Sequence, residues 1–187
     1  LTQTNNQDSV IAYNCGVCAD KIKKPTEALK YFDIAVQKKY NLANAYIGKA
    51  GALKDLKKND EYVATLKEGL EANPGNKTLT KMYATYYVNQ GILAQRAKKN
   101  SEAEEAFKQA IAIQPENVNA LNSLGSLYYS QGANTLKTDA DKAKVEFKEA
   151  KGYLEKLIPL LSANKPAQKK MMDNAKTMLN FIESQLK

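Results

Sequence analysis

The sequence predicts an all-α protein built from repeated helical hairpins. Similar sequence segments recur along the 187-residue chain, such as KMYATYYVNQG at Lys81 to Gly91 and ALNSLGSLYYSQG at Ala120 to Gly132. Within these segments apolar and small residues recur at helical spacing, and proline or glycine closes several of them. A fixed period of about 20 to 50 residues is the signature of a repeat architecture, so we expect one run of repeats.

Composition limits the function before any motif does. The chain is 43% hydrophobic and 26% charged, which allows a sizeable core, and its apolar runs are shorter than the ~18 residues that a membrane span needs. It contains no histidine and only two cysteines, which removes Ser-His-Asp and Cys-His catalysis and a closed zinc site. A Gly-rich phosphate loop is also missing. We therefore expect no enzyme, no cofactor and no metal site.

The second helix of each expected hairpin carries a shared pattern. TEALKYFDIAVQK (Thr26 to Lys38), EYVATLKEGLEANP (Glu61 to Pro74) and SEAEEAFKQAIAIQP (Ser101 to Pro115) have an acidic start, a large apolar residue in the middle and a small residue three positions later. Together with the Leu-Gly and Tyr-Tyr pairs, this resembles the tetratricopeptide repeat (TPR), with its ~34-residue pattern W-x2-L-G-x2-Y…A-x3-F…P. The resemblance implies a right-handed α-solenoid of about four TPR hairpins, closed by a C-terminal capping helix.

The repeats can be placed in order along one solenoid domain. In the first repeat Cys15 and Gly16 take the Leu-Gly positions and Phe32 lies in the second helix; in the second, Lys49 matches the leucine position poorly. Small residues at these positions are expected to let paired helices approach closely. The expected repeats are about 9–42, 43–76, 77–117 and 118–162, with a capping helix at about 166–186.

The third and fourth repeats depart from the regular length. About seven extra residues at 92–98 are expected to extend both helices of the third hairpin by nearly two turns. In the fourth repeat two sets of residues could pack in the second helix, one with Phe147 between Ala143 and Ala150, the other around Leu157 and Leu161. The final helix has one apolar face and is expected to be the cap, with a Met-rich partner-binding helix as the alternative. That face comprises Met171, Ala175, Met178, Leu179, Ile182 and Leu186.

Both cysteines lie in the short stretch NCGVC, Asn14 to Cys18. Because Cys15 occupies the leucine position and Cys18 precedes the tyrosine position, both thiols are expected to pack inside the first hairpin. The alternatives are a disulfide, if the protein is exported, and a redox role.

Lysines gather where the first helix of a hairpin ends. KIKK, KDLKK and RAKK stand at 21–24, 54–58 and 96–99, and together they predict a basic rim along one edge. The simplest explanation is that these lysines complement the helix dipole; the alternative is contact with an acidic partner or a membrane surface. Nucleic acid is not expected, because acidic residues are interleaved with the basic ones almost everywhere.

The resemblance also places the binding surface, since TPR proteins usually hold a peptide or a partner helix in the concave groove lined by the first helices. The polar residues expected there can hydrogen-bond a peptide backbone, although each could instead be a soluble lining. Of the basic and amide residues with which some TPR domains clamp chaperone tails, only Asn14 has a counterpart here, so that mechanism is not expected. The candidate groove residues are Tyr13, Asn14, Val17, Asn44, Ile47, Thr78, Met82, Thr85, Asn89, Asn119, Asn122, Ser123, Ser126 and Tyr129.

We therefore expect a bacterial, non-catalytic scaffold that binds a peptide or partner protein. The alternative is a structural subunit that assembles through its terminal helices. Because the chain starts with a short polar lead and no methionine, similar to mature exported TPR proteins, we expect export to the periplasm or cell envelope, with the cytoplasm as the alternative.

Overall fold

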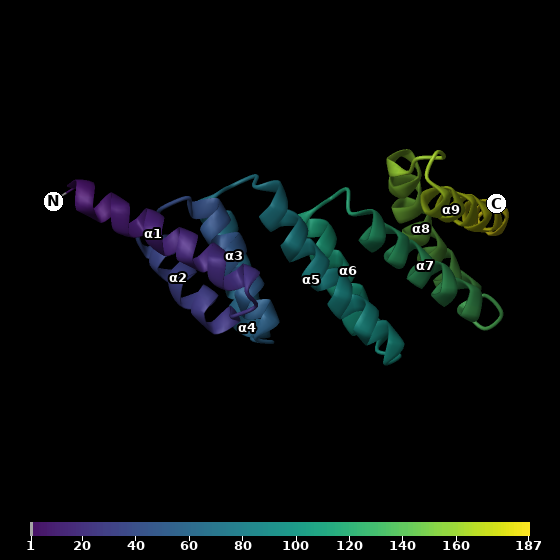
Figure 1. Ribbon diagram of the computed structural model, residues 1–187. Helices are drawn as coiled ribbons and strands as arrows, with labels where there is room; N and C mark the ends of the chain where they lie inside the picture. The colour runs from purple at the N-terminus through teal and green to yellow at the C-terminus, as the bar shows by residue number, and fades with distance from the viewer. Residues whose placement is uncertain (1) are drawn as a thin grey trace. The chain divides into compact units, whose positions relative to one another are not determined.

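The computed structural model describes residues 2–187, with side chains from residue 7 onward. Over this range the chain is all-helical, as predicted, with nine α-helices, one short 3-10 helix and no strand (Figure 1). None of these helices combines the length and the apolar character that crossing a membrane requires. The elements are α1 (Thr2–Lys21), α2 (Pro25–Gln37), α3 (Leu42–Asp55), α4 (Asn59–Ala72), α5 (Lys77–Arg96), α6 (Asn100–Ile113), α7 (Val118–Thr135), α8 (Ala140–Leu157), η1 (Ile158–Leu160) and α9 (Pro166–Gln185).

Consecutive helices pack as hairpins, and α9 packs against α7 and α8 as the predicted cap. The chain divides into two compact units, Leu1–Tyr83 (unit 1) and Ala84–Lys187 (unit 2), with the division inside α5. Each unit is described on its own below. The repeat boundaries expected from the sequence stay predictions.

Small residues bring the helices of a hairpin together, as expected. A Cβ atom added to Gly16 on α1 would lie 2.9 Å from Cδ1 of Phe32 on α2. A Cβ added to Gly125 on α7 would lie 2.7 Å from Cδ2 of Leu154 on α8. Both distances are shorter than real Cβ contacts, so a larger residue at either glycine would push the paired helix away.

Unit 1 has a core rich in alanine. Its large buried side chains include those of Phe32, Leu53, Leu66 and Leu79. Lys49, the poor match in the leucine position, has a partner that the sequence did not reveal. Its Nζ lies 2.8 Å from Oδ1 of Asp33 on α2, so an ion pair between α2 and α3 replaces the apolar contact. The buried alanines of this unit are Ala12, Ala19, Ala28, Ala35, Ala45, Ala50 and Ala52.

Unit 2 has a larger apolar core, centred on α7 and α8. On α8 the set with Phe147 between Ala143 and Ala150 is fully buried, and so is Leu157 of the alternative set, whereas Leu161 follows η1 and is only half-buried. The cap α9 buries Ala175 and Ile182 against this core. The large side chains that are fully buried in unit 2 are Phe107, Leu121, Leu124, Phe147, Leu154, Leu157 and Ile182.

Three hairpin turns end their first helix in the same way, with a lysine in the left-handed backbone region. Lys23, Lys57 and Lys98 have φ angles of 59°, 59° and 61°. In the first turn the N–H of Lys24 donates to the carbonyl of Ala19 at 2.9 Å, and the other two turns repeat this hydrogen bond. This is the Schellman arrangement, in which glycine is the usual left-handed residue, so each lysine adopts a strained backbone conformation.

Two expectations from the sequence are wrong. The extra residues at 92–98 lengthen α5 to 20 residues, against 14 for α3, but α6 keeps 14 residues like α4, so only one helix of the hairpin is extended. The thiols are not both packed inside the first hairpin: Cys18 is exposed and Cys15 is half-buried. The cause is helical geometry, because Ala19 points into the hairpin and Cys18, one residue earlier, is rotated by about 100°.

Candidate functional site

All fourteen candidate residues lie on the first helices of the hairpins, and none of them is buried. The exposed ones are Asn14, Asn44, Thr78, Thr85, Asn89 and Asn119, and the others are half-buried. We call these fourteen positions, those of unit 1 and those of unit 2 each taken within its own unit, the first-helix surface. Their place on α1, α3, α5 and α7 follows from the sequence, whereas a role in binding stays a prediction.

In unit 1 the aromatic part of this surface also supports the fold. The ring of Tyr13 packs edge-on against Phe32 and Tyr40, with centroids 6.0 and 5.8 Å apart. Val17 packs beside it against the same buried cluster. Asn14, by comparison, is exposed to solvent. Replacing Tyr13 or Val17 would therefore disturb packing as well as any ligand, and Asn14 is the cleaner probe.

In unit 2 the polar residues of α7 occupy the side opposite its core. Asn122, Ser126 and Tyr129 follow one another at helical spacing of four and three residues, while the nearby Leu121 and Leu124 are fully buried. The helix therefore offers amide and hydroxyl groups on one face and aliphatic packing on the other. Such groups can donate to and accept from the backbone of an extended peptide.

Phe181 on α9 adjoins this face, and the sequence analysis did not include it. Its ring lies 5.6 Å from that of Tyr129 and 5.8 Å from that of Phe147, both edge-on, and 37% of the residue remains exposed. The apolar face read from the sequence runs through Ile182, and Phe181 stands at its edge. In the sequence, the only indication of this role was an aromatic residue beside the apolar face of the final helix. Phe181 extends the apolar part of the first-helix surface onto α9.

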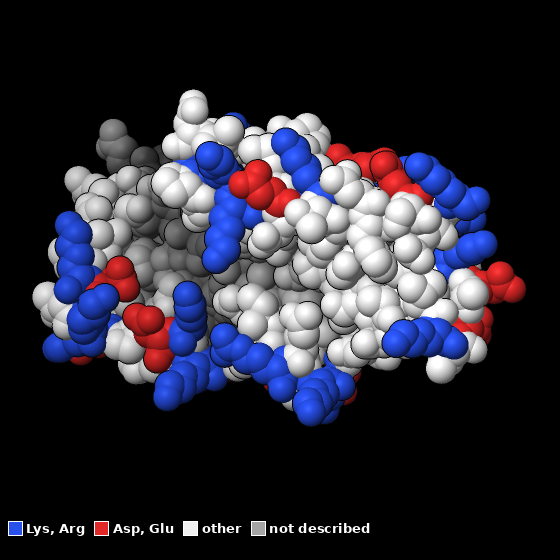
Figure 2. Space-filling model, turned by 90° about the vertical axis from the view of Figure 1, so that its right-hand side faces the viewer, with Lys and Arg blue, Asp and Glu red and all other residues white. Residues whose placement is uncertain are grey.

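The lysine-rich turns are less basic than their sequence suggests. The second lysine of each pair bonds to the glutamate three residues later, at 3.1 Å for Lys24 and Glu27, and the α3–α4 and α5–α6 turns repeat this pair. Figure 2 shows the same mixing on one face of the molecule, where acidic side chains stand among the basic ones around a largely uncharged centre. Contact with an acidic partner or a membrane at these turns stays a prediction.

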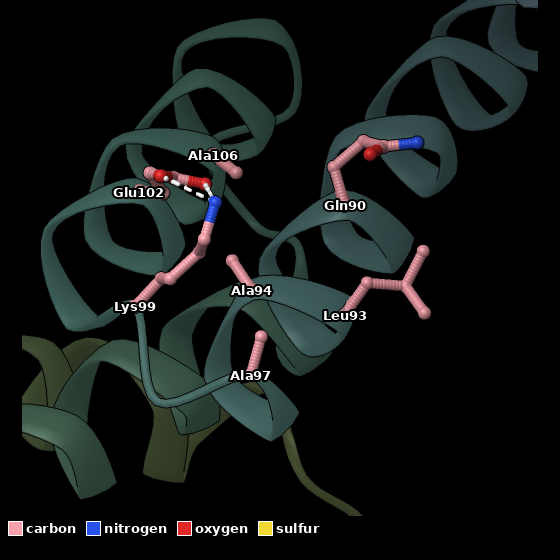
Figure 3. A pocket seen from close by; sticks show the side chains of 7 residues that line it. All are labelled: Gln90, Leu93, Ala94, Ala97, Lys99, Glu102 and Ala106. Carbon is pink, nitrogen blue, oxygen red and sulfur yellow. Dashed lines mark hydrogen bonds and ion pairs between the residues drawn. The ribbon is translucent and has the colours of Figure 1, made fainter.

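A hollow of about 290 Å³ lies between α5 and α6 of unit 2. It exists because the facing side chains of Ala94, Ala97 and Ala106 are small, and Figure 3 shows Lys99 reaching along α6 to Glu102 at its edge. It contains no residue of the first-helix surface. Its charged pair is the ion pair that recurs at the start of every second helix except α8, so the hollow is a consequence of the hairpin turn.

A hydrogen-bonded cluster in unit 2 ties α6 to α7. The hydroxyl of Tyr128 and Nζ of Lys108 both donate to Oε1 of Glu104, at 2.7 and 2.6 Å. Burial, and then the hydrogen bond to Glu104, raise the pKa of Tyr128 to about 12. Burial alone would raise the pKa of Glu104, but the hydrogen bonds from Lys108 and Tyr128 outweigh it and lower that pKa. These groups satisfy one another, so the cluster is a structural link.

No group of three or more His, Cys, Asp or Glu residues that could hold a metal ion occurs among the residues that the structure describes. The first-helix surface, with its amide, hydroxyl and aromatic groups, is the main candidate.

A family model described as TPR repeat matches residues 97–132. A crystal structure of a TPR repeats protein from Bacteroides fragilis is 47% identical in sequence, with a TM-score of 0.73, and the match covers 95% of this chain and 86% of that protein. No curated protein matches at a comparable level of significance.

Two more distant structures are similar over nearly the whole chain. MamA from Desulfovibrio magneticus is 15% identical, with 95% of this chain and 94% of that chain covered and a TM-score of 0.45. YrrB, a TPR protein with an unusual peptide-binding site, is 16% identical, with 95% and 90% covered and a TM-score of 0.43. Similarities of this size support no argument about function.

Proposed function

Because the chain belongs to the TPR family, whose members are generally protein-binding scaffolds and typically non-catalytic, we propose that it is a scaffold that binds an extended peptide or partner segment on its first-helix surface. The single observation that carries this proposal is the polar face of α7. There Asn122, Ser126 and Tyr129 are accessible on the side opposite the buried leucines. Asn122 and Ser126 are not members of the buried core of unit 2, whereas the ring of Tyr129 also packs against Phe147.

The chemistry of this surface suits a peptide main chain. Asparagine offers both donors and an acceptor, and serine offers a hydroxyl that rotates to suit either role. Tyrosine adds apolar contact area at modest entropic cost because it has few rotatable bonds. Tyr129 and Phe181 supply this contact area at the α9 side of the face. We infer a ligand with an extended backbone and at least one apolar side chain that packs on this aromatic pair.

Replacing Asn14, Asn89 and Asn122 together with alanine tests the proposal. Each lost hydrogen bond is worth about 0.5–1.5 kcal/mol in binding, so the affinity for a partner peptide should fall roughly ten- to two-thousandfold. The melting temperature should barely change, because Asn14 and Asn89 are exposed and Asn122 is half-buried. Titration calorimetry with a peptide identified by affinity capture measures the first effect, and thermal melts measure the second.

A matched control uses asparagines that are equally accessible but lie elsewhere. Asn134, Asn174 and Asn180 are exposed and outside the first-helix surface, so their triple replacement with alanine should leave both affinity and melting temperature unchanged. If the first triple variant binds with unaltered affinity, the first-helix surface is not the binding site. The lysine-rich turns then become the next candidate. The expected location in the periplasm or cell envelope belongs to this proposal too, and fractionation of the source bacterium would test it.

A further inference from the structure

The outward face of α1 carries a row of apolar side chains that the hairpin does not use. Ile11, Cys15, Cys18 and Ile22 follow one another at spacings of four, three and four residues. Ile22 lies one residue beyond the end of α1, but its N–H still donates to the carbonyl of Cys18 at 3.1 Å, so the four residues share one side. Ile11 is 59% exposed and Ile22 is 63% exposed. Cys18 is exposed as well and Cys15 is half-buried. We call these four residues the α1 stripe.

A different side of α1, rotated by about 100° from the α1 stripe, already satisfies the fold. Ala12, Gly16 and Ala19 are buried there, and α1 contacts both α2 and α3. The α1 stripe is therefore a second apolar face on a helix that needs only one. Single exposed apolar residues are ordinary, but an aligned row marks a contact surface. The large exposed hydrophobic residues of the described chain are Ile11, Ile22, Leu93, Val145 and Phe181, and only the first two share one helix face.

The spacing of the α1 stripe reads the same in both directions: isoleucine, three residues, cysteine, two residues, cysteine, three residues, isoleucine. An interface with two-fold symmetry requires a surface that is complementary to itself. When two such helices pack antiparallel, Ile11 of each copy meets Ile22 of the other, and Cys15 meets Cys18. A parallel pair would instead place every residue opposite its own equivalent.

Charge selects the antiparallel arrangement. Asp8 is exposed just before the α1 stripe, and Lys21 and Lys23 are exposed at its other end. Antiparallel packing brings the end of one stripe that carries Asp8 to the end of the other that carries these lysines, and it also opposes the two helix dipoles. Parallel packing would place like charges together at both ends. Lys24 is already paired with Glu27, which leaves the other two lysines to meet Asp8.

We propose that two copies of this chain associate through antiparallel α1 helices, with the α1 stripe as the centre of the interface. Since two helix stripes form a small interface, we expect a reversible dimer with a dissociation constant on the order of 10–100 µM. The α1 stripe contains no residue of the first-helix surface, so this proposal and the peptide-binding proposal can fail independently.

The first experiment exploits the pairing of Ile11 with Ile22. One variant carries Ile11→Glu and Ile22→Glu, and a second carries Ile11→Lys and Ile22→Lys. Sedimentation velocity at about 200 µM should show a dimer for the wild-type chain and a monomer for each variant alone, because like charges now face each other. An equimolar mixture of the two variants should again sediment as a dimer. Val145→Lys, at a residue 61% exposed on α8, is the matched control and should dimerise like the wild type.

The second experiment tests the relative orientation of the two α1 helices by disulfide formation between their thiols. Diamide oxidises two thiols to one disulfide and takes up the two electrons and two protons. In the antiparallel pair Cys15→Ser alone and Cys18→Ser alone each leave a thiol facing serine, so neither variant should form a covalent dimer, whereas a mixture of the two should. Circular dichroism checks that every variant keeps its helical content.

Three results would overturn the proposal. The wild-type chain could remain monomeric at 200 µM, which would favour a different occupant of the α1 stripe. The glutamate variant could dimerise as well as the wild type, which would place the interface elsewhere. Finally, Cys15→Ser alone could cross-link efficiently through Cys18 of both copies, which would exclude the antiparallel register.

Discussion

The first and last helices of the chain use their apolar residues differently. The cap α9 gathers them on one face, where Ala175 and Ile182 are buried against α7 and α8. The first helix α1 divides them between two faces, one buried and small, the other exposed and carrying Ile11 and Ile22. One end of the chain therefore has its apolar residues covered, and the other end presents a row of them to solvent.

The cores behind these two helices differ in the same direction. Unit 1 fully buries three large side chains, Leu53, Leu66 and Leu79, and otherwise depends on alanine and glycine. Unit 2 fully buries seven, among them Phe107 and Phe147. Apolar burial contributes roughly in proportion to area, so unit 2 gains more from transfer out of water. Unit 1 depends more on close approach of its backbones.

The largest expected effect comes from emptying the core of unit 2. Phe147→Ala removes a fully buried ring that touches Tyr129 and Phe181, so the free energy of unfolding should fall by about 3–5 kcal/mol. Denaturant titration measures this change. Phe147→Leu keeps most of the volume and should cost less than half as much. A loss below about 1 kcal/mol for the alanine variant would contradict the inference that the buried ring of Phe147 stabilises unit 2.

Unit 1 should respond most to added volume. A Cβ at Gly48 on α3 would run into the ring of Phe32, so Gly48→Ala should lower the free energy of unfolding by about 1–3 kcal/mol. Gly51 on the same helix is the matched control, because a Cβ there meets nothing within 4 Å. Gly51→Ala should raise stability by about 0.5–1 kcal/mol through helix propensity. If both variants changed stability equally, close packing at Phe32 would not be the reason for glycine at position 48.

The hairpins could be predicted because side-chain volume defines them locally. Gly16 with Phe32, and Gly91 with Phe107, form small and large pairs whose members are the same distance apart in the sequence. The ion pair of Lys49 with Asp33 could not be predicted, since the repeat pattern gives apolar positions and says nothing of a partner on the preceding helix. The left-handed lysines of the turns could not be predicted either, because glycine, the residue that usually marks a left-handed position, is absent there.

The α1 stripe escaped notice because α1 has apolar residues on two faces. A buried helix face is recognised in a sequence because the rest of the helix is polar. Ala12 and Ala19 form such a face, but the exposed Ile11 and Ile22 make another side of the helix apolar too and obscure it. The position of Cys18 was misjudged for a related reason, because the repeat tolerates a small residue there whether it is buried or exposed. The first-helix surface could be placed on its helices from the pattern alone. A pattern of positions cannot show which side chains bind, since solubility also favours polar residues.

A third prediction concerns alkaline pH and unit 2 alone. The folded-state pKa of Tyr128, about 12, lies above its ordinary value near 10, so the unfolded chain releases this proton first as pH rises. The stabilisation from neutral Tyr128 is complete below about pH 10 and is lost between pH 10 and 12, by on the order of 1–2 kcal/mol. Urea titrations across that range should show a steeper loss for the wild type than for Tyr128→Phe. Equal slopes would mean that the hydrogen bond to Glu104 does not hold the phenol in its neutral form.

The smallest expected effect distinguishes the lysine turns from the turn between α7 and α8. That turn has no left-handed residue, and its Asp139 caps α8 by accepting from the N–H of Lys142 at 2.9 Å. In the α3–α4 turn, Lys57 has a φ of 59°, a conformation that glycine adopts without strain. Lys57→Gly should therefore raise the free energy of unfolding by about 0.5–1 kcal/mol, which a rise in melting temperature measures.

The neighbouring lysine provides the control for this last change. Lys58 has an ordinary φ of −88° and pairs with Glu61 at 2.9 Å, so Lys58→Gly removes an exposed ion pair and relieves no backbone strain. Its melting temperature should stay the same or fall slightly, because exposed pairs contribute little. If Lys57→Gly also failed to stabilise the protein, the turn would hold its left-handed residue at no cost. In that case the left-handed backbone at position 57 would not be a source of strain, and lysine would fit there as well as glycine.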